Sequence, residues 1–432
     1  MDELEHRAIN KVFNRFIPFL MVCYFVAFLD RVNLGFAALQ MNESLRFSST
    51  VFGFGAGVFF LGYILLEVPS SFIQYRIGAR RWISRIMFTW GLASGAPAFL
   101  GSINWISTET QFYVLRFLLG AAEAGFFPGV IFFLTLWFPE RCRGRIHGMF
   151  MCVIPFSAAV GAPASTLILQ MDGILGMRGW QWIFLLEAIP AVILAVIVWL
   201  YLTDDPSEAR WLRTEERDVL VERLSSERRL RQRTTDDGSV LQVVRNPKIL
   251  TLGVVGFGMA FGVYAMGFFL PQIIKAFGVT NLQVGILAAL PFTIGGIGMI
   301  WYGRRSDRSA DLRKHTAIAM MIGAVGLVMV VATGDTLIKM IGICVASFGI
   351  FATMPTFWAL SSSVLTGAAC AVGLAVVNSI ASLAGFIGPW MFGIIKDATS
   401  SFDYGLLLVA STMLACALLV LQVRRETVPS VA

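Results

Sequence analysis

The chain has 432 residues, of which 57% are hydrophobic and 14% are charged, and its mean hydropathy is +0.74. Such a composition excludes a soluble protein of this length, and runs of about 20 apolar residues recur along it, as in proteins with many transmembrane helices. The net charge of +7 lies in short Lys and Arg clusters between these runs, which favours lipid headgroups over nucleic acid as the partner.

The apolar runs predict about twelve membrane-spanning helices in two sets of six. The first set is expected at about residues 16–39, 51–73, 82–101, 110–137, 146–170 and 180–202. The second set is expected at about residues 249–275, 283–302, 314–333, 336–360, 367–395 and 403–423. The polar start of the chain lacks the pattern of a cleavable signal, so we expect the first span to be retained.

Basic residues predict the orientation and the domain organisation. Lys and Arg gather in alternate connections, around Arg76–Arg85, Arg141–Arg145 and Arg304–Lys314, and the positive-inside rule therefore places both termini in the cytoplasm. We expect an N-terminal six-helix bundle at 1–202, a cytoplasmic linker at 203–246 and a C-terminal six-helix bundle at 247–432.

The linker is expected to contain an amphipathic helix. Val219, Leu220 and Leu224 are spaced to form a partly apolar face, which predicts a helix lying along the membrane surface. Docking of a partner protein is the alternative.

The two halves of the sequence echo each other. Tyr75–Arg81 and Tyr302–Arg308 follow the second and the eighth expected spans, at an offset of about 226 residues. Parallel repeats of six spans are typical of transporters whose binding site lies between the halves, near the middle of the membrane.

Ionisable residues inside the expected spans are few and fall mainly in the first half. They are Asp30, Arg31, Glu67, Arg116, Glu123 and Glu187. A charge at membrane depth costs roughly 2.5 to 3.5 kcal/mol even on lenient scales, so these residues are expected to face a cavity. A rise of 1.5 Å per residue puts Asp30 and Arg116 at about the same height, with Glu123 about 10 Å nearer the cytoplasm. Asp30, Arg31 and Arg116 are therefore expected to meet.

Two interpretations of this cluster remain open. One is a buried ion-pair network that only locks helices together. The other is proton coupling, because burial favours a neutral carboxyl group whereas a nearby arginine favours an ionised one. Protonation of Asp30 or Glu123 would then free an arginine, which would bind a substrate carboxylate.

Other polar residues suggest gating or substrate contact. Glu67 and Glu187 are interpreted as structural, with Glu67 placed to pair with loop arginines at a cytoplasmic gate; Asp307 with Arg308 reads the same way in the second half. Asn378 lies before the flexible stretch Gly385–Pro389, and an asparagine in a span bonds either a neighbouring helix or a ligand. Tyr63 and Trp358 could stack on a substrate or hydrogen-bond it, although packing is the better explanation for each of them alone.

Several segments together resemble the anion:cation symporter family of the major facilitator superfamily. They are Leu29-Asp30-Arg31-Val32-Asn33, Gly62-Tyr63, Glu67-Val68-Pro69-Ser70, Gly78-Ala79-Arg80-Arg81-Trp82, Arg116-Phe117-Leu118-Leu119-Gly120, Glu123-Ala124-Gly125-Phe126, Trp137-Phe138-Pro139-Glu140-Arg141, Gly179-Trp180-Gln181-Trp182, Phe357-Trp358-Ala359-Leu360 and Gly385-Phe386-Ile387-Gly388-Pro389. The resemblance covers nearly the whole chain, and it implies an all-α membrane protein with the major facilitator fold.

The resemblance also implies proton-coupled uptake of a small organic carboxylate by alternating access. The acids that family members use for proton coupling match Asp30 and Glu123 of this sequence. Its substrate positions fall on Arg31, Arg116 and Asn378. From the residues themselves, Tyr63 and Trp358 are further candidates for substrate contact, and gating is expected at Glu67, Arg80, Arg81, Asp307 and Arg308. Aromatic acids, tartrate-like acids and sugar acids are all open as substrates.

Further expectations concern partners and chemistry. We expect a monomer in the bacterial inner membrane, with protons as the coupling ion and neither a metal nor another cofactor. The sequence lacks a pattern of nucleophile and base or of metal ligands, so an enzyme is not expected. Export or exchange of organic anions is one alternative function, and a membrane receptor that does not transport is another.

Overall fold

The computed structural model describes residues 3–233, 246–309, 311–364 and 369–423. The chain forms two compact units. Unit 1 consists of Met1–Phe47 and Phe54–Thr234, and unit 2 consists of Ser48–Gly53 and Thr235–Ala432. The bundle boundaries expected from the sequence stay predictions.

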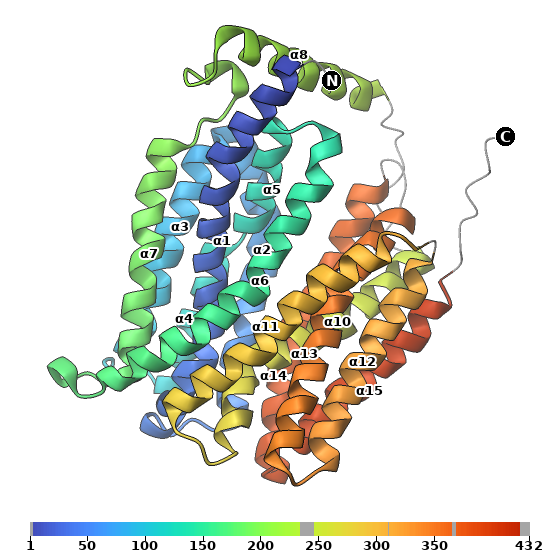
Figure 1. The fold of residues 1–432 in the computed structure, drawn as a ribbon. Helices are drawn as coiled ribbons and strands as arrows, with labels where there is room; N and C mark the ends of the chain where they lie inside the picture. The colour runs from blue at the N-terminus through green and yellow to red at the C-terminus, as the bar shows by residue number, and fades with distance from the viewer. Residues whose placement is uncertain (1–2, 234–245, 310, 365–368, 424–432) are drawn as a thin grey trace. The chain divides into compact units, whose positions relative to one another are not determined.

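Unit 1 is built from helices, which Figure 1 shows in blue to green. They are α1 (Glu3–Ser44), α2 (Ser49–Ile77), α3 (Ala79–Gly95), α4 (Thr108–Glu123), α5 (Phe126–Trp137), α6 (Glu140–Ile168), α7 (Gly179–Tyr201) and α8 (Thr214–Arg233); the first turn of α2, up to Gly53, is assigned to unit 2. Helix α7 packs against α3 and α1, so these three helices enclose one part of the unit's core.

Unit 2 is likewise helical (Figure 1). Its helices are α10 (Pro247–Lys275), α11 (Asn281–Ser306), α12 (Leu312–Ala332), α13 (Thr336–Val364), α14 (Ala369–Thr399) and α15 (Asp403–Leu421). Eleven helical segments within the described residues are long and apolar enough to cross a membrane. Helix α3 is shorter, with 17 residues, and a 3₁₀ turn at Ala96–Phe99 extends it.

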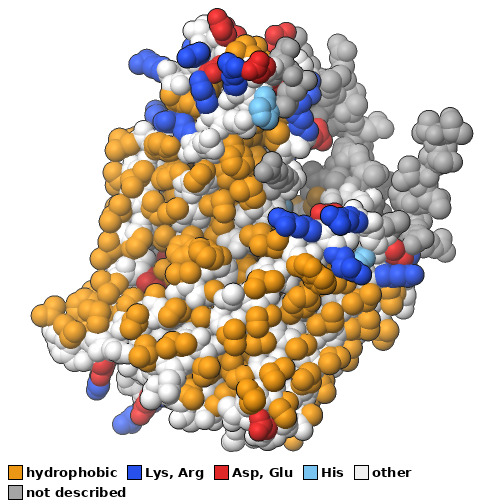
Figure 2. Space-filling model, viewed as in Figure 1, with side chains coloured by type: hydrophobic (Ala, Val, Ile, Leu, Met, Phe, Trp, Pro, Cys, Tyr) orange, Lys and Arg blue, Asp and Glu red, His pale blue; other side chains and the backbone are white. Residues whose placement is uncertain are grey.

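The surface of the membrane-spanning helices is largely apolar. Figure 2 shows hydrophobic side chains along the flanks of the helices, with Lys and Arg concentrated near α8 in unit 1. On α7, for example, Ile189, Ile193, Val196 and Leu200 are exposed. These residues recur every three or four positions and form one stripe, whereas Glu187 on the other side of the helix is buried. Helix α7 therefore turns an apolar face outward and carries its carboxyl group into the unit.

The fourth expected span, at 110–137, is divided into α4 and α5 in the structure. Gly125 has a φ of +87° and begins α5 in the left-handed conformation, which glycine adopts without the strain of a side chain. A Cβ atom at this position would also overlap the hydroxyl of Ser70. The break ends α4 at Glu123, and this residue is the last of its helix.

Helices α2 and α4 approach each other closely at Gly120. A Cβ atom there would overlap the backbone carbonyl of Phe59, so only glycine fits this crossing without a shift. The close approach brings the Phe59 ring against the charged residues of α1 and α4.

Helix α8 packs on the end of unit 1, against α1. Leu220 and Leu224 are buried, and Glu216 accepts a hydrogen bond of 2.7 Å from Lys11 of α1. Trp211, just before α8, stacks on Trp137 with 5.6 Å between ring centroids. Figure 1 shows α8 lying across the end of α1. Because α8 packs against α1, protein covers part of this face; the expected position of the helix along the membrane surface stays a prediction.

Candidate functional site

An ion pair in the interior of unit 1 joins α1 to α4. Arg31 Nη2 donates a hydrogen bond of 2.6 Å to Glu123 Oε1. The Glu123 side chain is 2% exposed and that of Arg31 is 16% exposed. The Arg31 guanidinium also lies 5.4 Å from the ring centroids of both Phe59 and Tyr63, a distance at which a cation is attracted to an aromatic face.

Arg116 is a buried cation whose guanidinium is only partly bonded. Its residue is 1% exposed, and its Nε donates a hydrogen bond of 3.3 Å to the carbonyl oxygen of Gly55. The guanidinium carbon lies 5.1 Å from the Phe59 ring centroid. Among the described residues, Nη2 has no hydrogen-bond partner. A buried donor of a charged group is costly when it forms no hydrogen bond. Nη2 can therefore bind an anion.

Asp30 turns away from the arginine that follows it in the sequence. Asp30 Oδ2 accepts a hydrogen bond of 2.6 Å from Trp90 Nε1 of α3. Glu187 and Glu123 are the carboxyl groups that act on it electrostatically. The depth argument expected Asp30, Arg31 and Arg116 to meet, but within the described part of the chain Asp30 forms no ion pair with either arginine. The estimated height of Asp30 is consistent with the structure, since Asp30 acts electrostatically on Arg116. The expected direction of the Asp30 side chain around α1 was wrong.

The gating candidates of unit 1 do not form the contacts expected of them. Glu67 is half-buried and feels the charge of Arg31, and within the described residues it forms no ion pair with Arg80 or Arg81. The backbone N–H of Arg80 donates a hydrogen bond of 2.7 Å to Asp204 Oδ1, and Arg81 is exposed. Their roles at a gate stay predictions.

Two of the substrate candidates belong to unit 2. Trp358 lies on α13 beside Phe357, with 5.3 Å between ring centroids. Asn378 lies on α14, and both residues are half-buried. Their part in substrate binding stays a prediction.

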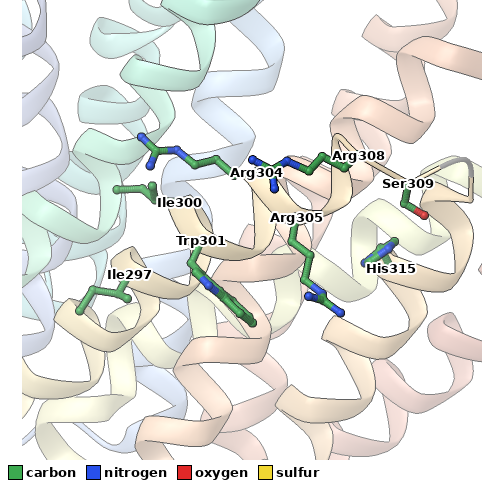
Figure 3. A pocket seen from close by; sticks show the side chains of 8 residues that line it. All are labelled: Ile297, Ile300, Trp301, Arg304, Arg305, Arg308, Ser309 and His315. Atoms are coloured by element: carbon green, nitrogen blue, oxygen red, sulfur yellow. The ribbon is translucent and has the colours of Figure 1, made fainter.

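The other gating candidates of unit 2 lie at the end of α11. Asp307 ends that helix, and Arg308 lines a groove of about 720 Å³ together with Arg304, Arg305, Trp301 and His315. Figure 3 shows the three arginines extending from the end of α11, with Trp301 preceding them. This groove is basic and can attract anions, and its lining residues all belong to unit 2.

Sequence reasoning missed the partners of the buried acids. Trp90 donates to Asp30, and Ser165 donates a hydrogen bond of 2.8 Å to Glu187 Oε1. Neither residue is ionisable, so neither stands out in an apolar span as a partner for a carboxyl group. Asn33 offered a signal, since it follows Asp30 by three positions and so lies on the same face of a helix.

Comparisons with known proteins agree with this architecture. The model of the Major Facilitator Superfamily matches residues 20–389. A protein of Agrobacterium vitis, provisionally named a tartrate transporter, is 44% identical over 99% of this chain and 93% of its own. A quinolone resistance transporter of Acinetobacter baumannii is 36% identical over 95% of this chain and 94% of its own.

The fold is also found among solved structures. The xylose transporter XylE from E. coli, in a partially occluded inward open conformation, has a TM-score of 0.74 at 14% identity and covers 95% of this chain and 98% of its own. The predicted fold class, an all-α membrane protein with the major facilitator fold, is confirmed.

Proposed function

Because the chain belongs to the Major Facilitator Superfamily of transporters, we propose that it takes up a small organic carboxylate together with protons by alternating access. It is a multi-pass membrane protein. Tartrate-like acids are the first substrates to test, since a relative at 44% identity carries a provisional tartrate name. Aromatic acids and sugar acids are the other candidates.

The observation that carries the proposal is the partly bonded guanidinium of Arg116. It is buried, it is charged, and its Nη2 donor is unused among the described residues. A substrate carboxylate supplies both the missing acceptor and the opposite charge, and arginine binds carboxylates with two parallel hydrogen bonds. An anion therefore gains more at this position than a neutral solute does.

Arg31 provides the second cation and the link to protons. Its guanidinium and that of Arg116 both lie beside the Phe59 ring, so two carboxylates of one small acid could reach both. Arg31 is held by Glu123. Protonation of Glu123 would remove the charge that holds Arg31, and the freed guanidinium would then bind the substrate. In this scheme the proton enters before Arg31 binds the substrate.

The remaining predicted residues complete the scheme. Asp30 is proposed as a second proton-coupling carboxyl group, and Asn378, Tyr63 and Trp358 as substrate contacts. Protons are the coupling ion, with no other cofactor. We place the protein in the bacterial cytoplasmic membrane with both termini in the cytoplasm, which the distribution of Lys and Arg supports.

Uptake into proteoliposomes tests the proposal. Radiolabelled tartrate should accumulate under an imposed inward proton gradient. Asp30→Asn and Glu123→Gln should abolish this accumulation but retain exchange of internal for external tartrate, because exchange needs no net proton movement. Glu109→Gln, an exposed residue in the first turn of α4, is the matched control. Accumulation at the level of the unmodified protein in both variants would refute the coupling residues.

The substrate class needs its own measurement. A ligand that binds the folded protein raises its thermal stability with the logarithm of the ligand concentration over Kd. Tartrate, a sugar acid and an aromatic acid should therefore be compared at several concentrations. If none of them stabilises the protein, the organic-acid assignment fails.

Export is a second candidate function. It is favoured by the relative at 36% identity that is named a quinolone resistance transporter. Loading proteoliposomes with a quinolone separates the two functions. Proton-driven loss of the drug, without uptake of tartrate, would favour export.

A further inference from the structure

Two buried carboxyl groups lie together in unit 1, away from the ion pair of Arg31 and Glu123. Asp30 of α1 is 3% exposed and Glu187 of α7 is 4% exposed. Glu187 acts electrostatically on Asp30, and Asn33, which follows Asp30 by three positions on the same face of α1, interacts with the Glu187 carboxyl group. Trp90 of α3 donates to Asp30 Oδ2, and Ser165 of α6 donates to Glu187 Oε1; the Ser94 side chain also interacts with Asp30. The pair therefore sits where α1, α3, α6 and α7 meet.

The buried hydrogen-bond acceptors around this pair outnumber the donors that reach them. Among the described residues, Asp30 Oδ1, Glu187 Oε2 and Asn33 Oδ1 are buried without a hydrogen-bond partner. The Asn33 amide interacts with the Glu187 carboxyl group, but not in hydrogen-bonding geometry to Oε2. All three atoms are acceptors, so none of them can satisfy another. Buried polar atoms are rarely left in this state.

The charged groups around the pair also argue against two ionised carboxyl groups. Within the described part of the chain, neither Asp30 nor Glu187 forms an ion pair with Lys or Arg. The ionisable groups of α4 that face Asp30 are Glu123 and the more distant Arg116. Helix α3 presents Trp90 and Ser94 to it. Two adjacent negative charges at membrane depth would repel each other in a medium of low dielectric constant.

We propose that Asp30 and Glu187 form a proton-binding pair that holds one proton between them, which makes Glu187 a third proton-binding carboxyl group of the transporter. A proton on Glu187 Oε2 turns one of the three unpaired acceptors into a donor. The new O–H can donate to Asn33 Oδ1 or Asp30 Oδ1. One negative charge then remains on the pair, and Trp90 and Arg116 stabilise it.

The pair gives Asp30 a neighbour with which to exchange its proton. When a second proton arrives, both carboxyl groups become neutral; when it leaves, the first proton stays on the pair. This part rests on the proposed function, because it assumes that Asp30 takes part in coupling. The bound proton itself does not depend on transport, and it can be measured without a substrate.

Infrared spectroscopy of the purified protein detects the proton directly. A protonated carboxyl group has a C=O stretching band that a carboxylate lacks. We expect such a band near neutral pH, and we expect ¹³C labelling of all glutamate residues to shift its glutamate part to lower frequency. Glu187→Gln should remove that part, whereas Glu109→Gln should leave it unchanged. A labelled spectrum without a glutamate C=O band, or one unaffected by Glu187→Gln, would overturn the proposal.

A second variant guards against a folding defect in Glu187→Gln. Ser165→Ala removes only the hydroxyl that donates to Glu187 Oε1, so it should shift the frequency of the same band without abolishing it. An unshifted band in this variant would show that the proton is not on Glu187.

Replacing K⁺ with Na⁺ in the buffer tests for a metal ion in place of the proton. The band should persist. Its loss in Na⁺ would show that the cluster binds a cation, and the shared proton would be rejected. The infrared results could be as expected while the Asp30→Asn variant still accumulates tartrate under a proton gradient. In that case the proposed coupling role of Asp30 fails, whereas the proton-binding pair stands.

Discussion

Arg31 and Glu123 form an ion pair of 2.6 Å between α1 and α4, whereas Asp30, the neighbour of Arg31 in the chain, bonds Trp90 of α3. Consecutive residues of a helix point in directions about 100° apart. The acid and the base that stand side by side in the sequence therefore serve two different sets of contacts. The contacts of Arg31 can respond to the substrate anion. The contacts of Asp30 lie on the side of α1 that faces α3, α6 and α7.

Breaking the Arg31–Glu123 pair should destabilise unit 1. Removing one partner of a buried ion pair costs about 3 to 5 kcal/mol, because the other charge is left without compensation. Arg31→Gln and Glu123→Gln should each lower the free energy of unfolding in detergent. The double variant should recover part of that loss, with a coupling energy of about 1 to 3 kcal/mol.

Chemical denaturation of the four proteins measures this cycle. A matched pair of exposed residues, Arg210→Gln and Glu109→Gln, should show no coupling. Additive effects of Arg31→Gln and Glu123→Gln would mean that the pair adds nothing to stability, and that its close contact has another purpose.

The sequence could predict features that depend on a single helix. It could not predict features that depend on how several helices pack together. The spans were predictable, since the length of apolar runs is fixed by the thickness of the bilayer. The shared stripe of Arg116 and Glu123 was also predictable, because both belong to α4 and helical periodicity sets their directions. The partner of Asp30 was not predictable, because it depends on how α1, α3 and α7 are rotated against one another.

The face of α8 shows the same limit. Its apolar positions were correct, as Leu220 and Leu224 are buried. What covers them could not be read from periodicity, since a membrane surface and a protein surface favour the same pattern. The pairing of Lys11 with Glu216 joins residues far apart in the chain, and no local signal marks it.

Arg116 and Glu123 should affect substrate binding in opposite directions. Arg116→Gln removes the buried guanidinium, and a hydrogen bond to a charged group contributes about 1.5 to 3 kcal/mol, so Kd for tartrate should rise by about 10- to 100-fold. Glu123→Gln frees Arg31 and should lower Kd. Isothermal titration calorimetry of the purified variants measures both changes. Equal weakening in the two variants would contradict the assignment of Glu123 as the residue that restrains Arg31.

Gly120 should be intolerant of a side chain. Gly120→Ala places a methyl group against the Phe59 carbonyl, and overpacking of this kind costs about 1 to 3 kcal/mol. The shift of α2 should also displace the Phe59 ring from beside Arg31 and Arg116, and so weaken binding of tartrate. Gly144→Ala is the matched control, because nothing lies near its added Cβ and alanine favours a helix. Thermal unfolding with and without tartrate checks both effects, and a stable Gly120→Ala protein with unchanged binding would contradict the argument.

The contact between α8 and α1 should depend on pH through Glu216. The hydrogen bond from Lys11 holds the pKa of Glu216 below its ordinary value of 4.5. A lowered pKa means that the folded protein favours the carboxylate, so the stabilisation is complete above about pH 4.5 and is lost as the pH falls through the folded-state pKa. The thermal midpoint of the unmodified protein should therefore exceed that of Glu216→Gln at neutral pH, and the difference should vanish in acid. Glu215→Gln removes the same charge from an exposed neighbour and should show no such dependence. A difference between the unmodified protein and Glu216→Gln that stays constant with pH would show that the contact does not rest on the charge of Glu216.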